Sequence, residues 1–185
     1  MNLFLREPNI EDKNELLQMS KELAESGDEH LFEGGGKLEK VLEMPYEDWL
    51  KELEKDKNIE LINPDWSNST NYVLVDDNNH IYGFSTLRHS LKGQLINIGG
   101  NISYIIRPTE RRKGYATIQL ELLLDKAKDL GLEKVLVICR DNNEGSRKTI
   151  EKCLGVQDKS VPSRYPNVME LRYWVPVKQK ENKLS

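Results

Sequence analysis

The residues of this sequence that could do chemistry gather in one short stretch, RPTERRKGYAT, which covers residues 107–117. Four cationic side chains precede a single glycine there, where an apolar segment gives way to a helical pattern. The first N–H groups of a helix lack partners and carry partial positive charge, so they attract anions. Gly114 has no Cβ atom and would let an anion approach the main chain. The stretch therefore predicts a diphosphate site. The cations at its rim are Arg107, Arg111, Arg112 and Lys113.

Two common phosphate-binding loops do not fit this sequence. The nucleoside triphosphatase loop Gly-x-x-x-x-Gly-Lys-Ser/Thr fails because Lys113 and Gly114 stand in the wrong order, and because GGGKL ends at Leu38 where a hydroxyl is needed. The dinucleotide fingerprint Gly-x-Gly-x-x-Gly is missing, since Gly114 is the only glycine between Gly100 and Gly131. Nucleoside triphosphate hydrolysis and NAD binding are therefore improbable.

The first half of the chain predicts the elements that precede this site. An apolar segment at residues 2–7 predicts a strand, and helical spacing over residues 9–26 predicts a helix capped by Asn9. A second helix is predicted from Pro45 to about residue 58. Residues 71–89 alternate around an Asp/Asn turn, which predicts a β-hairpin.

The second half predicts a strand, a helix and a parallel strand around the site. Residues 94–107 predict a long strand that Pro108 ends, in which the pair Gly99-Gly100 marks a bulge or a close backbone approach. An apolar stripe then predicts a helix up to Gly131. The stripe consists of Ala116, Leu120, Leu123, Ala127 and Leu130. The apolar run 134–139 predicts a strand buried on both faces, joined to its parallel partner by a right-handed crossover.

A short helix at 144–154 and a last strand at 167–177 complete the predicted domain. We expect residues 1–177 to form a single domain and residues 178–185 to be a disordered tail. Cys139 and Cys153 fall at predicted buried positions, which speaks against a disulfide or a metal site.

Composition limits the partners of this chain. Against 27 Lys and Arg stand 31 Asp and Glu, so the formal net charge of −4 gives no general attraction to nucleic acid or to anionic membranes. The amino terminus does not resemble a signal peptide, and no apolar run approaches the roughly 20 residues that a membrane helix needs. We therefore expect a cytoplasmic protein. The histidines at 30, 80 and 89 lack the spacing of metal ligands.

The pattern Arg111-x-x-Gly114-x-Ala116 resembles the acyl-CoA motif of the GCN5-related N-acetyltransferases (GNAT), Gln/Arg-x-x-Gly-x-Gly/Ala. The resemblance extends over residues 94–156 and includes Asn143-x-x-Ser146 followed by a helix and a glycine, which is similar to a second cofactor motif of that superfamily. It implies an α/β (α+β) fold: a mixed, mostly antiparallel sheet of six to seven strands, about four helices, and a splayed parallel strand pair at the cofactor site.

The resemblance also implies a function and a set of binding residues. The protein would move the acetyl group of acetyl-CoA to an amine of a small molecule or peptide by direct attack, with no metal and with a homodimer as a possible assembly. The oxyanion of the tetrahedral intermediate would be met by the N–H of Ile106. The main-chain groups implied for pantetheine are those of Tyr104, Ile105 and Ile106, and those implied for the pyrophosphate are the N–H groups of Arg112, Lys113, Gly114, Tyr115, Ala116 and Thr117. Asn143 would bond the cofactor, and Ser146 would cap the next helix or touch the same ligand; both could instead serve only as a helix cap.

The sequence departs from the family at its usual catalytic positions. Ile150 stands where many relatives have a proton-donating tyrosine, and Ile138 stands where amino-terminal acetyltransferases have a glutamate base. The sequence of residues 87–117 further resembles a bacterial subgroup of predicted acetyltransferases, in which we expect a histidine at the position of Asn101. We therefore assign no catalytic residue. The polar candidates near the cleft are Asn101, Ser103, Tyr104, Glu170 and Tyr173. An inactive acyl-CoA-binding sensor and an enzyme with a longer acyl donor remain as alternatives.

Overall fold

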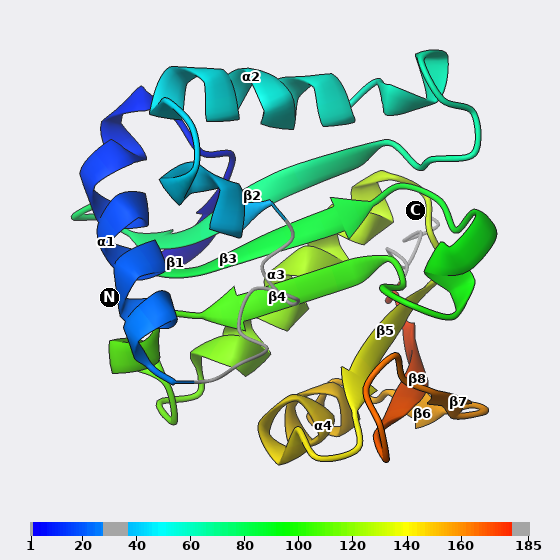
Figure 1. Cartoon of the computed structure of the whole chain (residues 1–185). Helices are drawn as coiled ribbons and strands as arrows, with labels where there is room; N and C mark the ends of the chain where they lie inside the picture. The colour runs from blue at the N-terminus through cyan, green and yellow to red at the C-terminus, as the bar shows by residue number, and fades with distance from the viewer. Residues whose placement is uncertain (1, 28–36, 179–185) are drawn as a thin grey trace, which may run out of the picture.

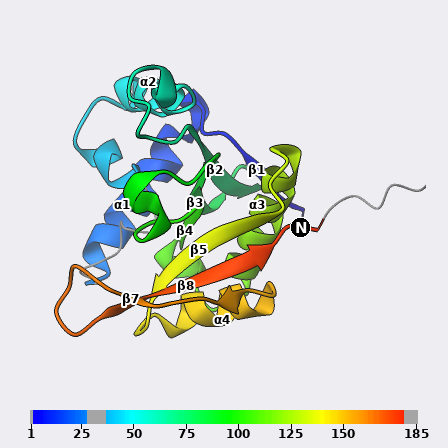
Figure 2. The same cartoon turned by 90° about the vertical axis from the view of Figure 1, so that its right-hand side faces the viewer.

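The computed structural model describes residues 2–27 and 37–178, so His30, the glycine-rich segment 33–36 and most of the predicted tail lie outside the described residues. A mixed sheet runs through the molecule, with the helices of the first half on one face and those of the second half on the other (Figures 1 and 2). The mixed α/β architecture agrees with the predicted fold class.

The elements of the first half agree with the sequence prediction. Their bounds are β1 (Leu3–Arg6), α1 (Lys13–Glu25), α2 (Tyr46–Asp56), β2 (Ser69–Asp76) and β3 (Ile81–Arg88). A 3-10 turn at Ile10–Asp12 precedes α1, and Asn9 caps it in a capping box, because its side chain accepts from Glu11 N–H while its own N–H donates to Asp12. β2 and β3 form the predicted antiparallel hairpin.

The second half carries the parallel crossover. Its elements are β4 (Ile102–Ile106), α3 (Tyr115–Asp129), β5 (Lys134–Arg140), α4 (Glu144–Lys152), β6 (Val156–Gln157), β7 (Val161–Pro162) and β8 (Met169–Pro176). The sheet order is β1-β2-β3-β4-β5-β8-β6, with β7 also paired to β8. Among the strands of residues 2–27 and 37–178, only β4 and β5 pair in parallel. Within the described part of the chain the sheet has eight strands rather than six to seven, because the count includes the two-residue strands β6 and β7.

Two apolar clusters fill the two faces of the sheet. One packs α1 and α2 against residues such as Phe84 and Ile105, with the indole of Trp49 fully buried at its centre. The other packs α3 and α4 against β4, β5 and β8, and contains Leu120, Leu123 and both buried cysteines. The cluster to which a strand residue belongs therefore tells which face of the sheet its side chain occupies.

The prediction of one long strand over residues 94–107 is wrong for its first half. A 3-10 helix occupies Gly93–Ile96, and β4 begins only at Ile102. Gly99 and Gly100 have φ of +114° and +65°, a left-handed region that a regular strand does not use. The predicted close backbone approach is confirmed: a Cβ at Gly100 would lie 2.4 Å from the carbonyl oxygen of Leu136.

Across residues 2–27 and 37–178, every helix is too short or too polar to cross a lipid bilayer.

Candidate active site

The two parallel strands are joined at one end and separate at the other (Figure 1). Ile102 and Val137 form the one β4–β5 pair in the described structure. Asn101 fastens the joined end, because its N–H donates to Leu136 O at 2.7 Å while its side-chain oxygen accepts from Leu136 N–H at 2.8 Å. The Asn101 side chain is thus engaged in holding the strands together, and it does not line the cleft beyond them.

The gap between the separating strands opens into a cavity of about 910 Å³. Every predicted cofactor residue except Lys113 lines it: Tyr104, Ile105, Ile106, Arg111, Arg112, Gly114, Tyr115, Ala116, Thr117, Asn143 and Ser146. The structure therefore brings together residues from β4, the start of α3 and the start of α4. A space of this size is within the range of small-molecule sites in proteins.

Alternate main-chain groups of β4 face the cavity. The N–H of Arg107 donates to Tyr82 O and the N–H of Arg88 donates to Asn101 O, which fixes the hydrogen-bonded pairs of the antiparallel β3–β4 ladder. Because such pairs alternate, the N–H groups of Tyr104 and Ile106 point away from β3, whereas the main chain of Ile105 faces β3. An extended ligand beside β4 could therefore pair with residues 104 and 106, but not with 105.

The start of α3 presents a row of N–H groups. Gly114 is the N-cap, with φ of +88° and open space where a Cβ would stand. The N–H of Thr117 donates to Gly114 O at 3.1 Å. This predicted phosphate-binding N–H group therefore already has an acceptor within the first turn of the helix. For residues 112–116, no acceptor of these N–H groups is found in the described part of the chain. This geometry suits an anionic oxygen.

Arg107 is not a cation of the cavity rim, contrary to the sequence prediction. Its side chain is 7% exposed and pairs with Glu22 at 2.7 Å and Glu15 at 2.8 Å, both from α1. The bond with Arg107 lowers the pKa of Glu22. The spacing of the two glutamates, seven residues apart on one helix face, is the signal in the sequence that could have revealed this pairing.

The other three basic residues of the motif differ in where their side chains lie. Arg111 donates from Nε to Ile106 O at 3.3 Å, which places its side chain across the end of β4. Arg112 is exposed and lines the cavity, with φ of +65°. The ammonium of Lys113 forms an ion pair with the Glu110 carboxylate at 3.0 Å, and Lys113 does not line the cavity. Two of the four predicted cations thus remain beside the cleft.

A polar cluster lies where β4 meets α4. The side-chain oxygen of Asn143 accepts from Ser146 N–H at 3.0 Å, so Asn143 caps α4. Ser146 Oγ lies 2.9 Å from the hydroxyl of Tyr104. Burial raises the pKa of Tyr104, and it raises the pKa of the neighbouring Cys139 to about 12. Both groups therefore stay protonated at neutral pH.

The remaining polar candidates divide between the cavity and the core. Ser103 and Glu170 line the cavity, whereas the Tyr173 side chain is buried beside α4, with its hydroxyl 3.2 Å from Glu151. Ile150 is fully buried in the core, and Ile138 lines the cavity. Arg88 and Arg164 also line it, and sequence reasoning did not assign them to the site. Arg88 shares a strand face with Phe84, so the two-residue alternation of β3 was the available signal.

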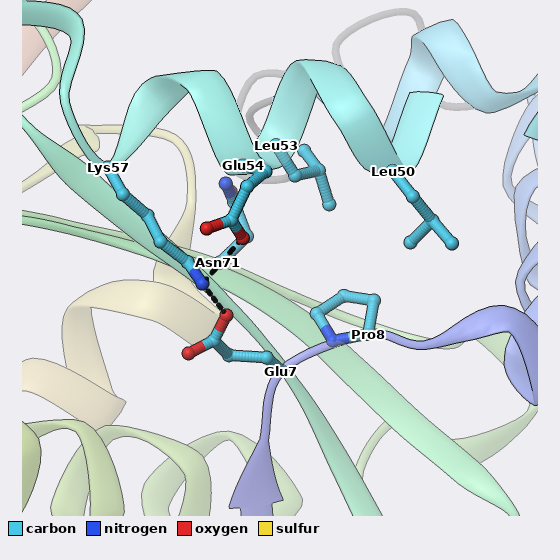
Figure 3. Close-up of a pocket in the computed structure, with 7 residues that line it drawn as sticks. All are labelled: Glu7, Pro8, Leu50, Leu53, Glu54, Lys57 and Asn71. Atoms are coloured by element: carbon cyan, nitrogen blue, oxygen red, sulfur yellow. Dashed lines mark ion pairs between the residues drawn. The ribbon is translucent and has the colours of Figure 1, made fainter. Parts of the chain in front are cut away.

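A second, smaller hollow of about 140 Å³ lies between β1, α2 and β2 (Figure 3). The ammonium of Lys57 stands between the carboxylates of Glu7 and Glu54, at 2.5 and 2.7 Å. It shares no lining residue with the large cavity. We therefore treat it as separate from the candidate active site.

A parallel strand pair that separates above the N-terminus of a helix, in an otherwise antiparallel sheet, is the arrangement of the GNAT acetyltransferase class. Comparison with known proteins supports this class. Residues 2–155 match the family model described as acetyltransferase (GNAT) domain. The chain belongs to this family and is an acetyltransferase. GNAT acetyltransferases use acetyl-CoA as the acetyl donor.

Solved structures share the fold at low sequence identity. An N-acetyltransferase from Staphylococcus aureus Mu50 is 16% identical, with a TM-score of 0.64 over 96% of this chain and 100% of the other. Spermidine N-acetyltransferase from Vibrio cholerae, solved with CoA and spermine, is 18% identical, with a TM-score of 0.59 over 95% of each chain. A putative ribosomal-protein-serine acetyltransferase from Vibrio cholerae is 13% identical, with a TM-score of 0.63 over 95% and 94%. No curated protein matches the sequence.

Proposed function

We propose that this protein is an N-acetyltransferase that moves the acetyl group of acetyl-CoA to an amine of a small molecule or peptide. The observation that supports it most is the row of N–H groups at residues 112–116, which opens into the same cavity as the unpaired edge of β4. A neighbouring fold is named for acetylation of spermidine, which is a small amine. We further propose residues 1–177 as its single domain; the cytoplasmic location and the homodimer stay predictions.

The cavity fits a diphosphate that carries a long extended arm. The pyrophosphate would lie on the N–H groups between Arg112 and Ala116, with the space beside Gly114 left open by its missing Cβ. The pantetheine arm would add to β4 as an extra strand through the main chain of Tyr104 and Ile106. Once bound, acetyl-CoA supplies an activated acetyl group as a thioester. Asn143, which caps α4 beside the cavity, would bond the arm through its remaining amide hydrogens.

The reaction needs alignment and the transfer of one proton. The amine nitrogen forms a bond to the acetyl carbon, the carbon–sulfur bond breaks, the nitrogen loses a proton and the sulfur gains one. Positioning alone can supply about 7 to 11 kcal/mol in ideal cases. The Ile106 N–H faces the cavity and would stabilise charge on the acetyl oxygen. We propose that Tyr104 donates the proton to the sulfur, and that the carboxylate of Glu170 binds the amine of the acceptor.

The test of this function is a comparison of two glycine variants. Gly114→Glu places a side chain and a negative charge in the proposed pyrophosphate site. Gly131→Glu serves as the matched control, because Gly131 also has a positive φ, of +75°, and open space around it. We expect acetyl-CoA affinity, measured by calorimetry, to fall by about 100-fold in the first variant and to stay within about twofold in the second.

Turnover is measured as release of free CoA thiol with a panel of amines. Equal acetyl-CoA affinity in the Gly114→Glu and Gly131→Glu variants would show that the assigned phosphate site is wrong. Tight binding without thiol release from any amine would instead favour the sensor. Comparing acetyl-, propionyl- and succinyl-CoA tests the alternative of a longer donor.

A further inference from the structure

Arg88 occupies the end of the cavity that lies farthest along β4 from the phosphate site. It is the last residue of β3, and its side chain lines the cavity together with Gly99 and Ser103. Residues 84, 86 and 88 share one face of the sheet, and Phe84 packs against α1 and α2. Arg88 thus lies on the face opposite α3 and α4, away from the elements that hold the donor in the proposed function.

The charge of Arg88 is not neutralised by the described residues around it. Its Nη1 donates to the carbonyl oxygens of Gly99 and Gly100 at 3.4 and 3.3 Å. No described carboxylate lies within ion-pair distance of it, whereas the more deeply buried Arg107 has two. Burial lowers the pKa of Arg88 and outweighs the opposing effect of Asp56. The Asp56 carboxylate is itself bonded to Lys37 at 2.7 Å. A partly desolvated cation without a counter-charge is costly unless a ligand supplies one.

Two further arginines line the cavity, at the end of β5 and in the loop before β8. Arg140 stacks on the ring of Tyr165 at 4.3 Å, and Arg164 lies 5.2 Å from the same ring. The carboxylates that line the cavity are Glu110, Glu144 and Glu170. Glu110 is bonded to Lys113 and Glu144 is bonded to Lys148. The third carboxylate, Glu170, accepts a hydrogen bond from Ser163 at 2.6 Å.

A cavity that is lined by both Arg88 and Glu170 fits a particular kind of amine. A polyamine would bring only positive charge to it and would meet repulsion from Arg88. A molecule that carries both an ammonium and an anionic group could place the ammonium at Glu170 and the anion at Arg88. The planar guanidinium matches a carboxylate in two parallel hydrogen bonds.

We infer that the acetyl acceptor is an amine that also bears a carboxylate, as an amino acid does, and that Arg88 binds this carboxylate. The inference rests on the proposed function for the acetyl transfer, but the recognition of the carboxylate can be tested without turnover. Recognition of a carboxylate on the acceptor would distinguish this protein from acetyltransferases whose acceptors are purely cationic.

The first experiment compares amino acids with their own carboxamides as acceptors. The amide keeps the amine, the size and the side chain, and removes only the negative charge. Using thiol release from acetyl-CoA with the twenty amino acids, their carboxamides and spermidine, we expect the best acid to exceed its amide in kcat/KM by about 10- to 100-fold. Equal use of acid and amide, or a preference for spermidine, would overturn the inference and leave the proposed function standing.

The second experiment assigns the recognition to Arg88. In Arg88→Met we expect KM for the best acid to rise about 10- to 100-fold while KM for its amide changes less than about threefold, and Arg88→Lys should recover part of the loss. Thermal unfolding of both variants checks the fold. A loss of equal size for acid and amide would indicate a structural role and contradict the assignment.

A binding measurement keeps the inference separate from turnover. We would titrate the CoA-loaded protein with the N-acetyl derivatives of the same amino acids and of their carboxamides, and then repeat the titration with Arg88→Met. If no amine is turned over but the acid binds at least about tenfold more tightly in the parent protein and not in the variant, the proposed reaction fails and the carboxylate site stands. If the acid and the amide bind alike, or neither binds, the carboxylate site is refuted.

Discussion

At the scale of single residues, the buried Arg107 and the half-buried Arg88 illustrate how nearby carboxylates affect the role of a cation. Arg107 meets Glu15 and Glu22 from α1 and ties that helix to the end of β4. Arg88 donates hydrogen bonds to two carbonyl oxygens and lines the cavity. The first arrangement satisfies the charge inside the protein, and the second leaves it for a ligand. The same side chain therefore ties two elements together at position 107, and we propose that it recognises a ligand at position 88.

Replacing Arg107 should destabilise the fold and not the binding of acetyl-CoA. In Arg107→Met two carboxylates lose their partner, and we expect the free energy of unfolding to fall by about 2 to 4 kcal/mol. The value lies below the range for fully buried pairs because the Glu15 side chain is 38% exposed. Urea unfolding measures it, with the exposed Lys113→Met as a control that should cost less than about 0.5 kcal/mol. Equal costs for the two variants would contradict the pairing.

The loss in Arg107→Met should also depend on pH. The hydrogen bond from Arg107 lowers the pKa of Glu22 in the folded protein, so its stabilisation is complete above the unfolded pKa of about 4.3. As the pH falls through the lower folded pKa, the carboxylate is protonated and the stabilisation disappears. The stability difference between parent and variant should thus be full at pH 7 and shrink below about pH 4. A difference that is constant from pH 7 to pH 3 would exclude this account.

Tyr104 is the residue whose replacement should slow the reaction most. Its hydroxyl lies in the cavity beside Ser146, and burial raises its pKa, so it stays a neutral donor at physiological pH. In Tyr104→Phe we expect kcat to fall by about 10- to 100-fold with little change in KM for acetyl-CoA. Ser146→Ala removes the neighbouring hydroxyl but keeps that of Tyr104, so it should lower kcat less. A kcat within about twofold of the parent would remove Tyr104 from the proton transfer.

At the scale of elements, the sequence predicted the order of helices and strands because their signals are local. The Asn9 capping box, the apolar stripe of α3 and the unbroken apolar run of β5 each depend on residues close in sequence. The start of β4 was misjudged because Ile96 and Ile98 resemble strand residues, yet they are 42% and 49% exposed. Just before β4 begins, the main chain of Gly100 lies close to that of Leu136, a contact between residues distant in sequence that local patterns do not reveal.

Gly100 should accordingly be the glycine near the site that tolerates a methyl group least. In Gly100→Ala the added Cβ would meet Leu136 O at 2.4 Å, in addition to the strain of a φ of +65°. Gly131→Ala has the same kind of strain without the contact, and we expect it to cost about 1 kcal/mol. Gly100→Ala should cost at least about 2 kcal/mol more by urea unfolding. Similar losses in the two variants would show that this backbone contact is not tight.

At the scale of the whole molecule, the sheet has two halves that meet at the joined end of β4 and β5. Sequence reasoning predicted the residues of the phosphate end of the cleft because they follow one another in a motif, from Arg111 to Thr117. At the end where we propose that the acceptor binds, it gave Ser103 and Glu170 as polar candidates near the cleft, but not Arg88 or Arg164. Arg88, Arg164 and Glu170 come from β3, the loop before β8 and β8, and only the folded sheet brings them to one cavity.

Coenzyme A bound in the cleft should join the two halves, and hydrogen exchange of single amides can detect it. The N–H groups of Tyr104 and Ile106 face the cleft, whereas those of Ser103 and Ile105 face β3. In the free protein we expect the first pair to exchange faster, and saturating CoA to slow that pair by at least about tenfold while the second pair changes much less. NMR-detected exchange measures all four, with Gly114→Glu at the same CoA concentration as the control. If CoA slowed the four amides equally, its effect would be general stabilisation and not an added strand beside β4.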